Sequence, residues 1–224
     1  MKYTHRQSRR AKRLSITVEP PGKVVVVSPP RVSQQKIDQF FQKHQNWAQT
    51  KLEKMNRIKR EIESTEQILI FGRHYQKKMI NSSRYPYGVF VQGEQLIINH
   101  PLANTNSSNL SVKKAKERFL KKTAAAYFKR RLPVLAKQMG VAYGRIKVRN
   151  QKTRWGSCSS GSQLNLNWRL VHWPQPIIDY LLVHELAHLK HPNHSPQFWQ
   201  LVAEHDPDYQ DHRRFLKKHA LPLL

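Results

Sequence analysis

The chain has 224 residues, with 40 lysines and arginines against 14 aspartates and glutamates, which gives a formal net charge of +26. A hydrophobic content of 38% argues against wholesale disorder, and a single cysteine excludes both an intramolecular disulfide and a multi-cysteine zinc site. The sequence has neither an apolar run long enough for a membrane span nor the apolar stretch of a signal peptide. We therefore expect a cytoplasmic protein whose substrates or partners are anionic.

The first hundred residues predict a small β-rich unit that contains one long helix. Alternating residues in Leu14–Val18 and the β-branched run Val24–Val27 flank a Pro-Pro-Gly turn, which is typical of a hairpin. Apolar residues at helical spacing predict a helix that begins after Ser33 and ends near Ile62. Turn residues then separate four predicted strands, at Gln67–Phe71, His74–Ile80, Tyr87–Gln92 and Gln95–Asn99.

A polar, turn-rich stretch at 101–109 is the best candidate for a domain boundary, and it divides the chain into residues 1–103 and 104–224. Beyond it the sequence predicts a long basic helix, three strands, an apolar helix and two final helices. These elements are Ser111 to Met139, then Arg145–Arg149, Arg154–Ser157 and Leu164–Trp168, then Ile177 to Lys190, and finally Ser195–Glu204 and Tyr209–His219. The fold class is therefore α+β, with a small mixed or antiparallel sheet in the second part.

The apolar helix carries the motif His184-Glu185-Leu186-Ala187-His188. Two histidines four residues apart lie on one face of a helix, so both imidazoles can reach one ion at about 2.0–2.1 Å. Glu185 lies about 100° around the helix, where it can act on a water molecule without being a ligand. This arrangement predicts a hydrolytic metal site, with zinc as the expected ion and another divalent metal as an alternative.

A catalytic zinc site needs a third protein ligand and one open position. His194 follows His188 by six residues, and Pro192-Asn193 between them should end the helix and turn the chain back. His191 and Glu204 are the other candidates.

The predicted mechanism has a metal-activated water attack a carbonyl or phosphoryl group, with Glu185 as general base. A further cationic or hydrogen-bonding group should stabilise the developing oxyanion. Arg154, Lys152, Tyr180 and His172 are the candidates for that role.

Several blocks together resemble the YgjP-like metallopeptidase family, which is related to the SprT-like and WLM zinc metallopeptidases. The blocks are Arg154 with Trp155–Ser160, Leu164–Trp168, Asp179-Tyr180 leading into the His184 motif, and Asn193-His194-Ser195 with Phe198-Trp199. They span about residues 152–199.

The resemblance implies a zincin-like domain in residues 104–224, with zinc bound by His184, His188 and His194 and with Glu185 as general base. It leaves the substrate divided between two classes. One is a peptide, in a protein that can be associated with nucleic acid. The alternative is a nucleoside triphosphate, because the family includes a member assigned as a UTP pyrophosphatase that releases UMP and diphosphate.

The substrate-binding residues we expect are Arg154, Lys152, Asn165, Asn167 and Trp155. In zincin folds an edge strand over the active-site helix pairs with an extended peptide, and Leu164–Trp168 can be that strand, with its asparagines facing outward. Trp155, Trp168 and Trp173 can stack on a base or belong to the core. The basic charge suits a phosphate-bearing substrate and association with nucleic acid equally well.

Overall fold

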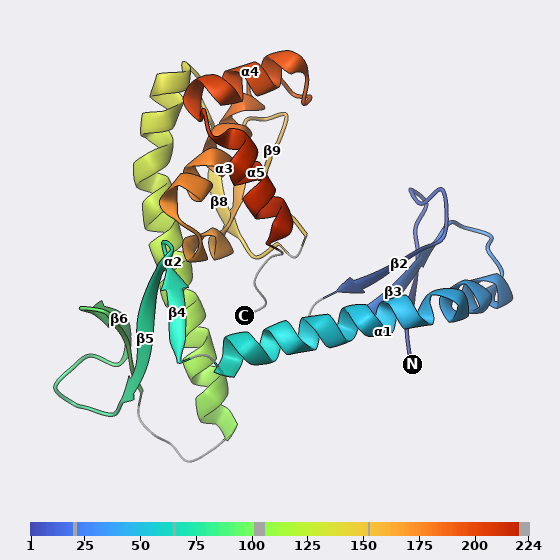
Figure 1. Ribbon diagram of the computed structural model, residues 1–224, viewed down its shortest axis with the longest axis horizontal. Helices are drawn as coiled ribbons and strands as arrows, with labels where there is room; N and C mark the ends of the chain where they lie inside the picture. Colours follow the sequence, from blue (N-terminus) through green and yellow to red (C-terminus); the bar gives the residue numbers. More distant parts are fainter. Residues whose placement is uncertain (20–21, 65, 101–105, 152, 220–224) are drawn as a thin grey trace. The chain divides into compact units, whose positions relative to one another are not determined.

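The computed structural model describes residues 1–19, 22–64, 66–100, 106–151 and 153–219, and gives the backbone alone for 54–64 and 106–110. Its internal contacts divide the described residues into two compact units, one before and one after residue 65 (Figure 1). None of the helices among the described residues is both long enough and apolar enough to cross a membrane.

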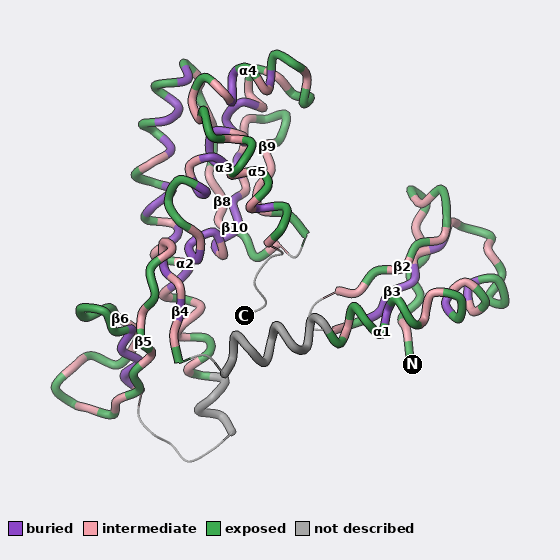
Figure 2. The backbone as a smooth tube through the Cα atoms, in the orientation of Figure 1, coloured by how far each residue is buried: buried purple, intermediate pink, exposed green. Residues whose placement is uncertain are grey.

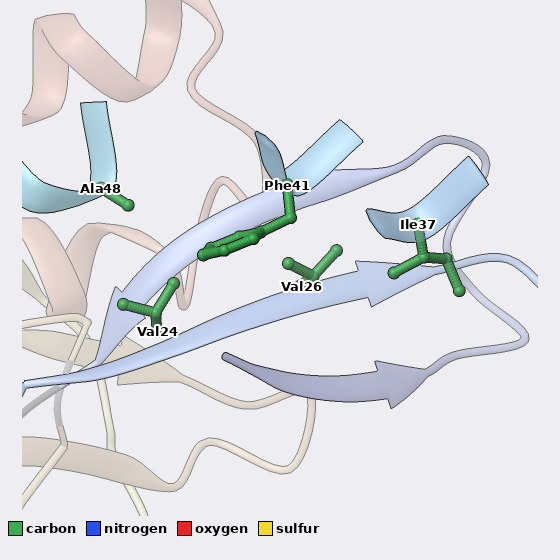
Figure 3. Packing of buried hydrophobic residues seen from close by; sticks show 5 residues of the cluster. All are labelled: Val24, Val26, Ile37, Phe41 and Ala48. Carbon is green, nitrogen blue, oxygen red and sulfur yellow. The ribbon is translucent and has the colours of Figure 1, made fainter. Parts of the chain in front are cut away.

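The first unit packs a three-stranded sheet against one long helix. Strands β1 (Thr4–Gln7) and β2 (Ser15–Glu19) flank the central β3 (Lys23–Ser28), parallel and antiparallel respectively, and α1 spans Gln34–Ser64. Alternate valines of β3 face the helix, where they form a buried cluster with side chains at helical spacing. Figure 3 shows this cluster, which consists of Val24, Val26, Ile37, Phe41 and Ala48.

The second unit begins with a four-stranded sheet in the order β4-β5-β7-β6. Its strands are β4 (Gln67–Ile70), β5 (Arg73–Ile80), β6 (Gly88–Gln92) and β7 (Gln95–Asn99), and β5 pairs with β7 in parallel. The 34-residue helix α2 (Asn106–Met139) follows and contacts β6.

The rest of the second unit combines a small mixed sheet with short helices. Strand β10 (Leu164–Asn167) lies between β8 (Ile146–Arg149) and β9 (Gly156–Cys158). A 3₁₀ helix (Trp168–His172), α3 (Gln175–Ala187), α4 (Pro196–His205) and α5 (Tyr209–Lys218) complete the chain. Figure 2 shows buried residues gathered where α2 faces this part, and α3 has nine buried residues out of 13.

The α+β class is confirmed, and so are the predicted hairpin, the four strands between 67 and 99, and the long helices. Strand β1 was not predicted, because residues 1–13 look like a basic tail. The compact units divide after residue 65, so β4–β7 belong with the second half, whereas the sequence places a boundary after 103. Residues 101–105 lie outside the described residues, and that boundary stays a prediction.

One expectation about the small sheet is wrong. Leu164–Trp168 is not an edge strand, because β10 pairs with β8 in parallel on one side and with β9 antiparallel on the other. Its leucines pack in the core, and Trp168 is fully buried at the start of the 3₁₀ helix. Strand β9 is an edge of the sheet in its place.

Candidate metal centre

Three histidines from two neighbouring segments meet beside α3. One ring nitrogen from each of His184, His188 and His194 lies within 4.8 Å of the other two. The Nε2 atoms of His184 and His194 are 3.1 Å apart. The rival third ligands, His191 and Glu204, are not part of this cluster among the described residues. The backbone carbonyl oxygen of His191 is 3.3 Å from His188 Nδ1, and Glu204 accepts a hydrogen bond from Gln200.

Local sequence explains why the third histidine comes back to the helix. Helix α3 ends at Ala187 with His188 as its C-cap, and the chain turns through Pro192. Ser195 then caps α4, its hydroxyl accepting from the backbone N–H of Phe198, and proline occupies the first turn of that helix. The capped start of α4 therefore fixes the backbone next to His194.

Aromatic packing holds the three imidazoles in place. Phe198 is fully buried, and its ring centroid lies 5.0, 4.7 and 4.7 Å from those of His184, His188 and His194. The exposed His194 also stacks on Trp199 at 5.5 Å. Burial, with the neighbouring histidines, lowers the pKa of His184 to about 3, which keeps its nitrogens available as ligands at neutral pH.

The donor set fits a divalent metal ion. Two nitrogens at a zinc–nitrogen distance of about 2.1 Å and a tetrahedral angle would be roughly 3.4 Å apart, close to the 3.1 Å between the two Nε2 atoms. The hydrogen bond from His188 Nδ1 to a backbone carbonyl leaves its Nε2 as the lone-pair nitrogen. Three imidazoles without a carboxylate suit zinc better than magnesium or calcium.

Glu185 lies next to the histidines and is almost completely buried, with 4% of its surface exposed. Burial raises the pKa of its carboxyl group to about 8, while Arg154 and a hydrogen bond from the backbone N–H of Cys158 act in the opposite direction. Its Oε2 has no hydrogen-bond partner among the described residues. Burial therefore favours the protonated carboxyl near neutral pH in the metal-free protein, and a cation held by the neighbouring histidines would favour the carboxylate that a general base requires.

Gly156 makes room for this carboxylate. A Cβ atom built on Gly156 would lie 2.5 Å from Glu185 Oε1 and 2.9 Å from its Cδ, closer than atoms can pack. The sequence suggests that this glycine serves a tight turn, but the contact shows that it serves the close approach of β9 to the general base.

The histidines and Glu185 line an open cavity of about 660 Å³ together with the segment that follows Arg154. Arg154, predicted to bind substrate, is exposed on this wall. Lys152 lies outside the described residues. The other residues that line the cavity are Gly156, Ser157, Cys158, Ser159, Ser160, Ser162, Leu189 and Pro192.

The remaining predicted substrate residues lie behind this wall. Asn167 is fully buried, and its amide donates to the carbonyls of Gln151 and Arg154, so it holds the loop before β9. Asn165 is half-buried, and its amide group is 3.4 Å from the Ser157 hydroxyl. Trp155 packs edge-on against Trp173 at 6.0 Å. Their predicted roles toward substrate stay predictions.

Two candidates for oxyanion stabilisation occupy buried positions. Tyr180 is 3% exposed, and burial raises its pKa to about 12, which keeps the phenol neutral; its ring lies 6.0 Å from that of His184. His172 is 5% exposed and hydrogen-bonds the carbonyl of Leu69 in β4, so it belongs to the packing of the first sheet of this unit.

The sequence did not reveal three features of the site. These are the packing of Phe198 against the three histidines, the backbone N–H of Cys158 that donates to Glu185, and the need for a residue without a side chain at Gly156. The proximity of Trp155-Gly156-Ser157-Cys158 to the active-site helix is a long-range contact, which no local spacing reveals. The helical spacing of the His184 motif, by contrast, is local and predicts its own geometry.

A family model described as YgjP-like, metallopeptidase domain, matches residues 12–219. The metallopeptidase zymogen abylysin of Pyrococcus abyssi is 22% identical, with a TM-score of 0.36, over 42% of this chain and 97% of that one. The zymogen jannalysin of Methanocaldococcus jannaschii is 20% identical, with a TM-score of 0.36, over 41% and 97%. No curated protein matches the sequence.

The family match extends across both compact units and includes all three histidines and Glu185. The protein is a metal-dependent hydrolase, and the chain belongs to the YgjP-like metallopeptidase family.

Proposed function

We propose that this protein is a zinc-dependent peptidase that binds an extended peptide along the free edge of β9. The observation that carries the proposal is the place of this edge: a Cβ atom at Gly156 in β9 would lie 2.5 Å from Glu185 Oε1, so a chain paired with the strand would lie beside the general base.

Backbone hydrogen bonds support this use of the edge. Strand β9 pairs with β10 through alternate residues, since Asn167 N–H donates to the carbonyl of Trp155 and Ser159 N–H donates to that of Gln163. The polar backbone groups of Gly156 and Cys158 therefore face away from β10. The N–H of Cys158 donates to Glu185, which leaves both groups of Gly156 and the carbonyl of Cys158 for an added strand.

The residues then divide the chemistry between them. His184, His188 and His194 would hold the zinc ion, which when bound polarises a scissile carbonyl and makes water more acidic. Glu185 accepts the proton of the attacking water and passes it to the departing amine. Glu185 lines the cavity and accepts a hydrogen bond from the backbone N–H of Cys158. Among the described candidates for stabilising the oxyanion, Arg154 is the one that lines the cavity, and it is exposed there.

The alternative, hydrolysis of UTP to UMP and diphosphate, uses the same centre with a different substrate. A triphosphate concentrates negative charge that proteins neutralise with several cations. Among the described residues that line the cavity, Arg154 is the single lysine or arginine, while four are serines. This lining favours a peptide over a triphosphate.

The test is a parallel assay of the zinc-reconstituted protein with an unstructured protein substrate and with UTP. We expect cleavage of the protein substrate, and we expect Glu185→Gln to lower kcat by at least about 100-fold because general-base catalysis contributes roughly 10²–10⁴. The variant should retain stoichiometric zinc, measured by elemental analysis, because Glu185 is not a ligand.

The outcomes separate the two substrates. Turnover of UTP with no cleavage of protein would contradict the peptidase proposal and support the pyrophosphatase alternative. Full activity of the Glu185→Gln variant would remove Glu185 from the mechanism. As a control for the ligand set, His194→Ala should lose zinc, whereas His191→Ala should keep it.

A further inference from the structure

A second cavity of about 660 Å³ opens between α2 and the sheet that contains β6. We call it the α2 groove. Its walls combine exposed cationic side chains of α2 with aromatic rings from both elements, and neither the metal ligands nor Glu185 lines it. The peptidase mechanism makes no use of it.

The charge of the α2 groove is one-sided. Arg118, Lys122 and Arg130 line it and are exposed, and none of the described residues that line it is acidic. Glu117 is the one acidic residue of α2 and pairs with Lys121 at 2.6 Å. No carboxylate in the described part of the chain pairs with any of the three groove cations, so their charge is available to a ligand.

The aromatic side of the groove is also available. Tyr87 lines it with 61% of its surface exposed, so its ring is accessible to a ligand. The fully buried Asn99 fixes the preceding loop, because its amide donates to the carbonyls of Ser82 and Tyr85 and its oxygen accepts from the N–H of Ser82. These bonds fix the backbone that leads into Tyr87.

We propose that the α2 groove binds single-stranded nucleic acid, with Arg118, Lys122 and Arg130 contacting phosphates and Tyr87 stacking on a base. Sites for single strands combine a basic track with aromatic faces, which only unpaired bases can use. Phe119 and the Phe71–Tyr127 pair, whose ring centroids are 5.1 Å apart, complete the apolar wall beside the cations.

The length of the track favours a strand over a single nucleotide. Arg118 and Arg130 are twelve residues apart on one helix, which places their Cα atoms about 18 Å apart along its axis. Arg130 lies over the ring of Tyr127, with its guanidinium carbon 5.7 Å from the ring centroid, so its charge is held beside the groove. A strand of several nucleotides can follow the whole of this track.

The test is fluorescence anisotropy of the full chain with a labelled oligothymidylate of about ten nucleotides, at salt concentrations from about 50 to 200 mM. Three phosphate contacts predict a slope of log K against log salt of about −2. Arg118→Gln/Lys122→Gln should reduce the slope by about 1.4 and weaken binding. The matched control, Lys113→Gln/Lys114→Gln, removes two exposed charges from the same helix outside the groove and should retain most of the affinity. Equal losses in the two double variants would overturn the proposal.

The aromatic contact has its own pair of variants. Tyr87→Ala should weaken binding roughly ten-fold, whereas Tyr87→Phe should keep the affinity because the ring remains. Two outcomes would contradict a single-strand site. One is a duplex that binds as tightly as the single strand. The other is displacement of the oligonucleotide by UTP at a concentration equal to the Kd of the oligonucleotide. Because the assay needs no turnover and is repeated on Glu185→Gln, its result does not depend on the peptidase proposal.

Discussion

At the scale of single residues, the metal centre depends on what lies behind the ligands as much as on the ligands themselves. His184 and His188 follow from helical spacing, and His194 from the turn at Pro192, so all three were predictable. Gly156 belongs to a block that the sequence singles out, but the reason for a glycine there is its closeness to Glu185, which is visible only in the folded structure. Local spacing fixes side chains on one helix; it does not fix which strand passes over that helix.

Gly156→Ala tests this contact. We expect the added methyl group to displace the Glu185 carboxylate and to lower kcat by ten-fold or more, with zinc content unchanged. Gly161→Ala is the control, because the nearest atom to a Cβ there is the Ser159 hydroxyl oxygen at 4.0 Å. Wild-type kcat in Gly156→Ala would mean that Glu185 can move freely and that β9 does not position it.

At the scale of elements, the hairpin of β4 and β5 is joined to the 3₁₀ helix by a short set of contacts. Phe71 N–H donates to the carbonyl of Val171 at 2.6 Å, and His172 Nδ1 lies 2.7 Å from the carbonyl oxygen of Leu69. Burial, opposed by that bond and assisted by Arg169 and Lys116, lowers the pKa of His172 to about 4. The imidazole is therefore neutral in the folded protein near pH 7.

This pKa predicts an acid-dependent loss of stability. Between pH 6.5 and 4 the unfolded chain binds a proton at His172 and the folded chain does not, so the free energy of unfolding should fall by up to about 3 kcal/mol as the pH decreases through this range. His172→Asn keeps a donor for Leu69 and does not titrate, so its stability should vary less with pH. Urea denaturation of both metal-free proteins at pH 7 and pH 4.5 measures the difference; identical pH dependence would contradict the assignment.

Element boundaries were largely predictable from the sequence, but strand neighbours were not. The pattern at Leu164–Asn167 predicted β10, yet the same alternation suits a central or an edge strand, and only its pairing with both β8 and β9 decides between them. Strand β1 pairs with β3 although its four residues are all exposed. No hydrophobic pattern marks such a strand.

At the scale of the whole molecule, the basic residues that give the net charge of +26 are distributed unevenly. The metal cavity contains one described lysine or arginine, whereas α2 alone carries ten basic residues against one acidic residue. The net charge of α2, 10 − 1 = +9 of the total +26, therefore lies on a helix that lines the α2 groove and not the metal cavity. A peptidase with a separate basic groove would be suited to proteins that accompany single-stranded nucleic acid.

The two compact units predict how far the chain can be shortened. A protein that begins at Glu66 keeps β4–β7 against the 3₁₀ helix and should fold and bind stoichiometric zinc. One that begins at residue 104 loses the contacts of Phe71 and His172 and the close packing of Gly72 on Pro174, so it should melt at a lower temperature or fail to fold. Circular dichroism and zinc analysis measure both, and equal melting temperatures would favour the boundary near residue 103.

The lone cysteine has a practical consequence. Cys158 is the single thiol of the chain, and it lines the cavity that the three histidines share. A thiol-reactive fluorophore therefore attaches to the unaltered sequence at one position, beside the reaction centre. The rate of labelling, followed while zinc or a peptide is added, would report on occupancy of the cavity without any engineered probe.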